Sequence, residues 1–345
     1  MKRFFVMSLV GVFIVGLILC VYATPAPAQK PIELTMTYMY PSGTDTDLQL
    51  QRWAKKVEKD SKGRLKIKIY PGAVLVSAFE IYSSIPKGVA DIGFGPRYGI
   101  GAPFTDELFA MVLMGTPDVA TSTLVVKDLM KKYPEQYAKE WGDTKVLWIQ
   151  ADPSSNLFTR NKPIRTPEDI KGMELRAPIK PAVEAYKAMG AKAVGMPIAD
   201  FVIGLQKGTV DGGTTTVKDI KSYKFTSVAK YFTEFALFTC PAIYMVMNKD
   251  KWKALPPDLQ KVMDDNCKWG ERELVKFLDD VTISSKEWAT KEGMEFITLK
   301  REERKKWVAA LQPVYLRIAA ELDAKGYPAT EAFKYGQERL EHYMK

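Results

Sequence analysis

Hydrophobic and polar residues alternate along the first hundred positions in a way that predicts strands and helices in turn. Residues 33–39 and 65–69 alternate with period two, as half-buried strands do. Between them an amphipathic helical pattern ends at Gly63, and a short helical pattern over 80–85 precedes a further strand over 90–94. The order strand, helix, strand, helix, strand predicts an α/β sheet with parallel pairing.

The same alternation restarts after about residue 150. Thr166, Pro167 and Asp169 form a helix-start signal, with a capping threonine, a proline at the first helical position and an acid three residues after the cap. The elements predicted beyond it are a strand over 173–176, a helix over 181–189, a strand near 193–196, a helix near 199–207 and a strand from residue 210. This second series predicts a second α/β lobe.

The C-terminal third has a helical pattern. An apolar stripe without an interrupting proline predicts one continuous helix from Pro257 to Glu292. At about 1.5 Å per residue this helix would be roughly 50 Å long, which is enough to brace two lobes. A last helix over about 303–324 carries Pro313 and is expected to kink there.

The N-terminus has the pattern of a secretory signal. Met1-Lys2-Arg3 is followed by the uncharged residues 4–23 and by small residues and prolines before Gln29. We expect a cleavable signal over residues 1–28 and a periplasmic mature chain that begins near Gln29. Two alternatives stay open, because the uncharged run is long enough for a retained membrane anchor and Cys20 could carry a lipid.

Composition narrows the kind of site that the chain can hold. Of 345 residues, 46% are apolar and 26% charged, which is typical of a folded protein. The one histidine, His342, lies near the C-terminus, whereas a zinc site or a hydrolase triad needs a histidine inside a cleft. The net charge of +9 comes from lysines interspersed with acids, so nucleic acid is not an expected partner. We expect no catalytic residue, no metal, no cofactor and, between Cys240 and Cys267, no disulfide.

Several runs of residues, taken together with their spacing, resemble one protein family. They are residues 63–72 (GRLKIKIYPG), 169–178 (DIKGMELRAP) and 205–213 (LQKGTVDGG). The chain resembles TRAP-transporter solute-binding proteins of the DctP type over nearly all of its mature length. The resemblance implies an α/β, two-lobed periplasmic binding protein fold with a ligand cleft between the lobes and a long bracing C-terminal helix.

The lobe boundaries follow from the restarted pattern and from the resemblance. We expect lobe I to comprise residues 29–152 and about 242–282. We expect lobe II, with the C-terminal helices, to comprise residues 153–241 and about 283–345.

Arg176 is the leading candidate for contact with a ligand. The resemblance implies that the arginine at the end of the Leu-Arg-x-Pro strand clamps a substrate carboxylate, and Arg176 occupies that position. The chemistry suits this role, because a planar guanidinium donates two parallel charge-assisted hydrogen bonds to a carboxylate and stays protonated. Ligands of open α/β sheets bind in the crevice beyond the strand ends.

The chain departs from the family pattern at two further positions. Asn156 stands where many relatives have a second arginine, and Thr215 stands at the position of a common asparagine. We expect Asn156, Thr215 and the neighbouring Thr214 to contact the ligand, although β-propensity is an alternative reason for the threonines. A single arginine that binds a carboxylate, Arg176, favours a monocarboxylate over a C4-dicarboxylate as the ligand.

The first lobe offers four more candidates. The loop after the strand over 90–94 places Arg97 and Tyr98 at a strand end, where they could contact a ligand or form a plain turn. Tyr38 and Tyr40 lie at the end of the first strand and could equally belong to the core.

These observations predict an extracytoplasmic, monomeric binding protein that captures a small organic acid anion and delivers it to a TRAP membrane permease. A sensor protein that presents the ligand to a membrane receptor is an alternative. An exported enzyme is a further one, which would need an acid/base pair that the sequence does not reveal.

Overall fold

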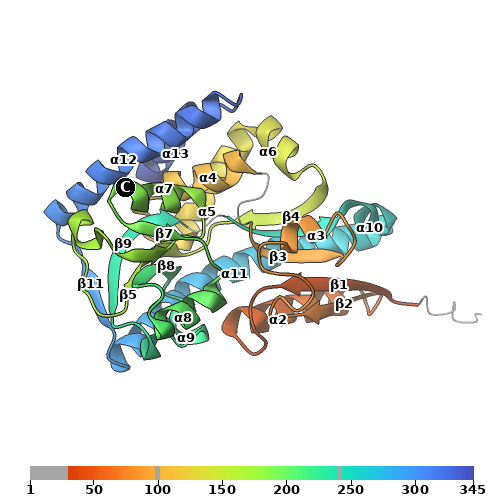
Figure 1. Ribbon diagram of the computed structural model, residues 1–345. Helices are drawn as coiled ribbons and strands as arrows, with labels where there is room; N and C mark the ends of the chain where they lie inside the picture. Colours follow the sequence, from red (N-terminus) through yellow and green to blue (C-terminus); the bar gives the residue numbers. More distant parts are fainter. Residues whose placement is uncertain (1–29, 98–101, 240–241) are drawn as a thin grey trace, which may run out of the picture. The chain divides into compact units, whose positions relative to one another are not determined.

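The computed structural model describes residues 30–97, 102–239 and 242–345 and contains two separate β-sheets (Figure 1). Residues 33–345 form one compact unit. The predicted signal over residues 1–28 and the candidate Tyr98 lie outside the described residues.

The first sheet has the strand order β2-β1-β3-β10-β4. Its strands are β1 (Ile32–Tyr38), β2 (Leu65–Tyr70), β3 (Ile92–Pro96), β4 (Thr144–Gln150) and β10 (Ile243–Asn248). β1 and β3 are parallel, as the sequence predicts. β10 comes from far along the chain and runs antiparallel to both β3 and β4, so the sheet is mixed.

The second sheet has the strand order β11-β9-β5-β8-β6-β7. Its strands are β5 (Ser154–Thr159), β6 (Glu174–Arg176), β7 (Lys192–Val194), β8 (Gly212–Thr216), β9 (Tyr231–Thr239) and β11 (Glu295–Thr298). β6 is parallel to β7 and β8, as expected of an α/β series. β5 is antiparallel to β8 and β9, so this sheet is mixed as well.

Helices surround both sheets in the described parts of the chain. The α-helices are α2 (Asp45–Asp60), α3 (Ile81–Ser84), α4 (Pro103–Val112), α5 (Val119–Lys132), α6 (Pro134–Trp141), α7 (Lys180–Ala188), α8 (Ile198–Lys207), α9 (Asp219–Ser222), α10 (Lys249–Ala254), α11 (Pro257–Lys291), α12 (Arg301–Asp323) and α13 (Ala329–Tyr343). Two short 3-10 helices are η1 (Pro167–Ile170) and η2 (Phe225–Ser227). The helix start predicted at Thr166 is therefore confirmed, although only one 3-10 turn follows it.

The chain passes directly from a strand of one sheet to a strand of the other twice, once in each direction. β4 leads into β5, and β9 leads back into β10. Gln150 pairs with Ile243 on one side of the passages, and Ser154 pairs with Thr239 on the other. The strands that enter and leave these two connections are therefore paired in both sheets.

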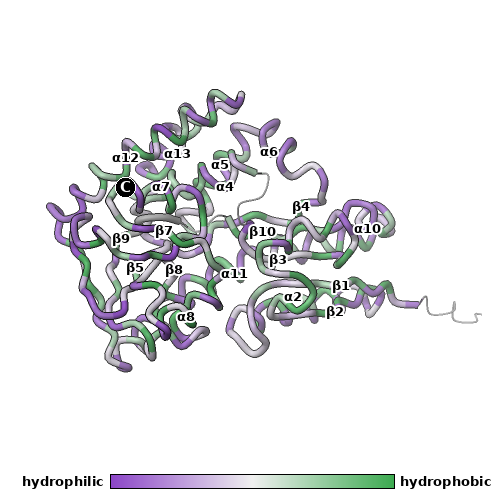
Figure 2. Tube along the Cα trace, in the orientation of Figure 1, coloured by the Kyte–Doolittle hydropathy of each residue, from purple (hydrophilic) through white to green (hydrophobic). Residues whose placement is uncertain are grey.

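Helix α11 confirms the predicted long helix, with 35 residues. At about 1.5 Å per residue it is roughly 50 Å long. Its Asp264 pairs with Lys145 of the first sheet at 3.6 Å, and its Lys286 forms an ion pair with Glu234 of the second. Hydrophilic and hydrophobic residues alternate along α11 (Figure 2), as expected of a helix with one buried face.

The second sheet is covered on both faces by apolar side chains. Alternate residues of a strand point to opposite faces. Phe158 of β5 packs with Phe201 of α8, whereas the adjacent Leu157 belongs to the cluster that contains Tyr186 of α7 and Trp307 of α12. Phe201 and Tyr186 therefore cover opposite faces of the second sheet, and a side chain of this sheet can be assigned to one face or the other.

Candidate functional site

Arg176 ends strand β6 and is buried, with only 3% of its surface exposed. Its Nε donates to the carbonyl of Met196 at 2.9 Å and its Nη1 to the carbonyl of Thr214 at 2.6 Å. The guanidinium carbon lies 5.5 Å from the centre of the Phe201 ring. Among the described residues, no carboxylate forms an ion pair with Arg176.

This environment leaves a buried charge without a counter-charge from the described part of the protein. A guanidinium has five N–H donors, and the two carbonyl bonds fix its orientation while leaving donors available. Taking an unpaired charge out of water costs several kcal/mol, so buried arginines normally have an acidic partner. An anionic ligand would supply that partner.

Three of the predicted residues share one face of the second sheet. Arg176 is opposite Gly213 in the β6–β8 ladder, and Asn156 is opposite Thr215 in the β5–β8 ladder. Paired residues point to the same face, and so do residues two apart on a strand. Arg176, Thr215 and Asn156 therefore lie on the Phe201 face, at the ends of neighbouring strands.

Gly213 makes room for Arg176. A Cβ atom at position 213 would lie 2.5 Å from the Cβ of Arg176 and 2.8 Å from its backbone nitrogen. A side chain at this position would displace the arginine, so the glycine allows the close approach of β6 and β8.

Thr214 contacts Arg176 only through its carbonyl group. Alternation along β8 places its side chain on the opposite face, the one that carries Tyr186. Burial raises the pKa of Tyr186, and the Thr214 side chain and the charge of Arg176 partly offset that effect. The sequence analysis did not predict that Thr214 and Thr215 lie on opposite faces of the sheet.

A charged cluster next to the site was missed by sequence reasoning. The Thr215 and Thr216 hydroxyls donate to Asp219 Oδ2 at 3.0 and 2.8 Å. Lys218 Nζ lies 3.3 Å from Asp219 and 3.3 Å from Asp152, which is located between β4 and β5. In the sequence, Lys218-Asp219 looks like any exposed charged pair, and only the fold shows that both are buried.

The first-lobe candidates occupy different environments. Tyr40 is 3% exposed, and Lys218 Nζ lies 5.2 Å from the centre of its ring. Tyr38 is fully buried and donates to Asp47 Oδ1 at 2.5 Å; burial, and then this hydrogen bond, raise the pKa of its hydroxyl. Tyr38 thus fits the core alternative, whereas Tyr40 reaches the Lys218 cluster.

Arg97 is buried inside an aromatic cage. Its guanidinium carbon lies 3.7 Å from the centre of the Tyr82 ring and 4.7 Å from that of Trp141, and its Nη1 donates to the Glu140 carbonyl at 2.9 Å. Since Arg97 follows Gly95 and Pro96, alternation places it on the face of the first sheet that carries Tyr244, opposite the face of Phe94.

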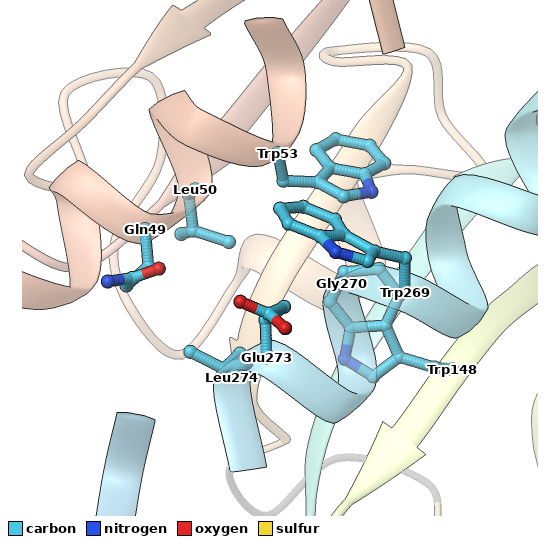
Figure 3. A pocket seen from close by; sticks show the side chains of 8 residues that line it. All are labelled: Gln49, Leu50, Trp53, Trp148, Trp269, Gly270, Glu273 and Leu274. Atoms are coloured by element: carbon cyan, nitrogen blue, oxygen red, sulfur yellow. The ribbon is translucent and has the colours of Figure 1, made fainter. Parts of the chain in front are cut away.

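Two cavities of very different size adjoin these elements. A cavity of about 540 Å³ is lined by Asn156 and by Pro153 of the connection between β4 and β5. Residues of the 115–119 segment, of α11 and of β9 also line it. A second one, of about 10 Å³, is lined by Trp53, Trp148 and Trp269 and by Gly270 of α11 (Figure 3). The larger volume is in the range of small-molecule sites, whereas the smaller holds at most one water.

The two mixed sheets and the long helix define a periplasmic binding protein fold, and solved structures share it. A TRAP solute-binding protein from Rhodoferax ferrireducens T118, in complex with copurified benzoate, is 23% identical with a TM-score of 0.83, covering 91% of this chain and 98% of that one. A marine metagenome TRAP solute-binding protein specific for aromatic acid ligands, with bound metahydroxyphenylacetate, is 21% identical with a TM-score of 0.80, covering 91% and 100%.

Sequence comparison assigns the family. The family model for bacterial extracellular solute-binding proteins, family 7, matches residues 36–322, and the chain belongs to this family, the DctP type of TRAP solute-binding proteins. A solute-binding protein of Albidiferax ferrireducens is 27% identical over 219 residues, which are 58% of this chain and 60% of that protein. The chain thus spans three fifths of that relative. Within the described ranges, no helix has both the length and the apolar character needed to cross a membrane.

Proposed function

We propose that the chain captures an aromatic or similarly compact monocarboxylate in the periplasm and delivers it to the membrane subunits of a TRAP transporter. In this proposal Arg176 binds the carboxylate, and the chain acts as a monomer that binds its ligand without converting it. Its export depends on the cleavable signal predicted over residues 1–28. N-terminal sequencing of the secreted protein tests that last point, and a chain starting near Gln29 is expected.

The burial of Arg176 without an acidic partner among the described residues is the observation that carries the proposal. Its two hydrogen bonds to carbonyls hold the guanidinium in a fixed orientation. A carboxylate is the ligand whose geometry matches the remaining N–H donors and whose charge offsets the desolvated cation.

Solved relatives support the ligand class. Those with TM-scores of 0.83 and 0.80 hold benzoate and metahydroxyphenylacetate, and others hold mandelate or β-D-galacturonate. Each of these ligands carries a single carboxylate. In this chain the uncharged Asn156 shares a sheet face with Arg176, and the Phe201 ring lies next to the Arg176 guanidinium, which favours one carboxylate on an apolar or aromatic body.

The two sheets are proposed to be the cores of two lobes that close on the ligand. The first lobe would comprise residues 29–152 and about 242–282, and the second the remainder of the mature chain. The short connection between β4 and β5, residues 151–153, would act as a hinge, because a few loop residues can absorb the backbone rotation of one lobe against the other. The ligand would bind beyond the strand ends, where Arg176 and Tyr40 are located.

Replacing Arg176 with methionine tests the proposed site. The variant removes every donor and leaves the carboxylate without its partner, which typically costs about 2–5 kcal/mol. At about 1.4 kcal/mol per tenfold change, affinity should fall roughly thirty-fold to several thousand-fold. A thermal-shift screen of monocarboxylates that begins with benzoate finds the ligand, and titration calorimetry measures the loss.

Two further variants sharpen this test. Arg176→Lys should restore binding only in part, because an ammonium group cannot donate the two parallel hydrogen bonds that a guanidinium donates to a carboxylate. Arg160→Met is the matched control, since Arg160 follows β5 and lines two other surface cavities. Arg176→Met binding within about three-fold of the wild type would place the anion site elsewhere, with Arg97 as the next candidate.

A further inference from the structure

Lys218 carries a buried positive charge at a point where three parts of the fold meet. It follows strand β8 and is 5% exposed. Its Nζ lies 3.3 Å from Asp152, in the crossover between β4 and β5, and 3.3 Å from Asp219, at the start of α9. The same Nζ lies 5.2 Å from the centre of the ring of Tyr40, which follows β1 of the first sheet.

This cluster is connected to Arg176 through a short run of residues. Arg176 donates to the Thr214 carbonyl, while the hydroxyls of the next two residues, Thr215 and Thr216, donate to Asp219 Oδ2. The position of Asp219, fixed by Lys218, therefore constrains the end of β8 against which the guanidinium is oriented.

We propose that Lys218 is a positioning residue that couples the anion site on the second sheet to Tyr40 on the first sheet and to the crossover. The proposal rests on the proposed function in so far as Arg176 holds the anion. Lys218 orders the end of β8 through Asp219, and it keeps the segment at Tyr40 in contact with the same charge cluster.

The chemistry of the cluster explains why a cation is needed at position 218. Without it, the carboxylates of Asp152 and Asp219 would lie close to each other, both buried and without their shared partner. Tyr40 would lose the cation over its ring. Arginine would keep the charge and can stack on an aromatic ring, whereas methionine would keep only the side-chain length.

Hydrogen exchange in the ligand-free protein tests the coupling. The Gly72 and Ala73 amides donate to the carbonyls of Tyr40 and Tyr38, both at 2.8 Å, and so report on the first-sheet segment. Lys218→Met should speed their exchange about three-fold or more, and Lys218→Arg should stay near the wild type. A role confined to the end of β8 would leave these two amides unchanged.

Two variants complete the exchange experiment. Lys221→Met is the matched control, because Lys221 is exposed on α9, and it should change neither amide. Tyr40→Leu leaves both ion pairs of Lys218 intact, so it decides the question if Lys218→Met does not fold, and it too should speed exchange at Gly72 and Ala73. Unchanged exchange in both Lys218→Met and Tyr40→Leu, or an equal change in Lys221→Met, overturns the proposal.

Calorimetry with benzoate as the probe tests the link to the anion site. Affinity should fall about five-fold or more in Lys218→Met, which is about 1 kcal/mol at 1.4 kcal/mol per tenfold, and should be largely restored in Lys218→Arg. An affinity within two-fold of the wild type in Lys218→Met also overturns the coupling. If the wild type does not bind benzoate, the aromatic ligand class fails, and the exchange measurements decide the coupling by themselves.

Discussion

Asp152 is a buried acid whose protonation responds to mildly acidic pH. It is 3% exposed, and its Oδ1 has no hydrogen-bond partner among the described residues. Burial raises its pKa to about 6; Lys218 lowers this value and Asp219 raises it. An unperturbed aspartate has a pKa near 3.9, so folding favours the protonated form of Asp152.

Because of this raised pKa, Asp152 should make the free energy of unfolding depend on pH. Because the pKa is higher in the folded state, the contribution of Asp152 is fully present below about pH 4 and is lost as pH rises through about 6. The difference in unfolding free energy between the wild type and Asp152→Asn should therefore fall by on the order of 2 kcal/mol between pH 4 and pH 7. Urea unfolding of both proteins across this range measures it, and a difference that does not change with pH would contradict the assignment.

Helix α11 packs closely against α2 at Gly270. A Cβ atom there would lie 2.6 Å from Trp53 Cδ1 and 3.2 Å from Trp148 Cη2, and Figure 3 shows the two indoles beside this turn of α11. The Trp53 indole also donates to the Asn266 carbonyl of α11 at 3.2 Å, so the ring has little freedom to move away. The glycine allows the close contact between the helices.

Gly270→Ala should therefore destabilise the protein although alanine is the better helix former. Overpacking a rigid contact costs about 1–3 kcal/mol, against a propensity gain of up to about 1 kcal/mol. We expect a net loss of about 1 kcal/mol in unfolding free energy, measured by denaturant titration. Lys268→Ala, at an exposed position of the same helix, is the control and should lie within about 0.5 kcal/mol of the wild type. A variant more stable than the wild type would show that the two tryptophans can move.

Local patterns predicted some elements well and others not at all. Helix α11 was expected over 257–292 and is found at Pro257–Lys291, because its polar and apolar positions follow a helical period. Helix α4 was not predicted, since eight of its ten residues are buried and it lacks a polar face. The antiparallel placement of β10 between β3 and β4 depends on pairing with distant strands, which a local pattern does not record.

Some residues of the candidate site could likewise be predicted from the sequence, and others could not. Arg176 could be identified because its motif has a fixed spacing. The face that it shares with Thr215 and Asn156 depends on the registers of the β6–β8 and β5–β8 ladders, which a local pattern does not record. Lys218 and Asp152 could not be identified from the sequence, because neither belongs to a recognisable motif. Their role depends on the contact between them, which only the fold brings about. Arg97 was predicted as a ligand contact, but its aromatic cage becomes visible only when α3 and α6 are placed beside β3.

Ligand binding is expected to draw the two proposed lobes together. Small-angle scattering should give a smaller radius of gyration with saturating ligand, found by the thermal-shift screen, than without it. Arg176→Met at the same ligand concentration is the control and should keep the ligand-free value. An unchanged profile for the wild type at saturation would argue against closure of the two lobes.

The position of β10 has a consequence for the order in which the chain can fold. β3 and β4 are not neighbours, because β10 lies between them and pairs with both. A chain growing from its N-terminus therefore has a one-strand gap in its first sheet until residues 243–248 have been made, by which time every strand of the second sheet except β11 already exists. Neither sheet can be completed by a fragment that ends before residue 243. A nascent chain of this topology should stay incompletely folded until most of it has been synthesised, which is the condition in which an unfolded polypeptide can be threaded through a translocation channel.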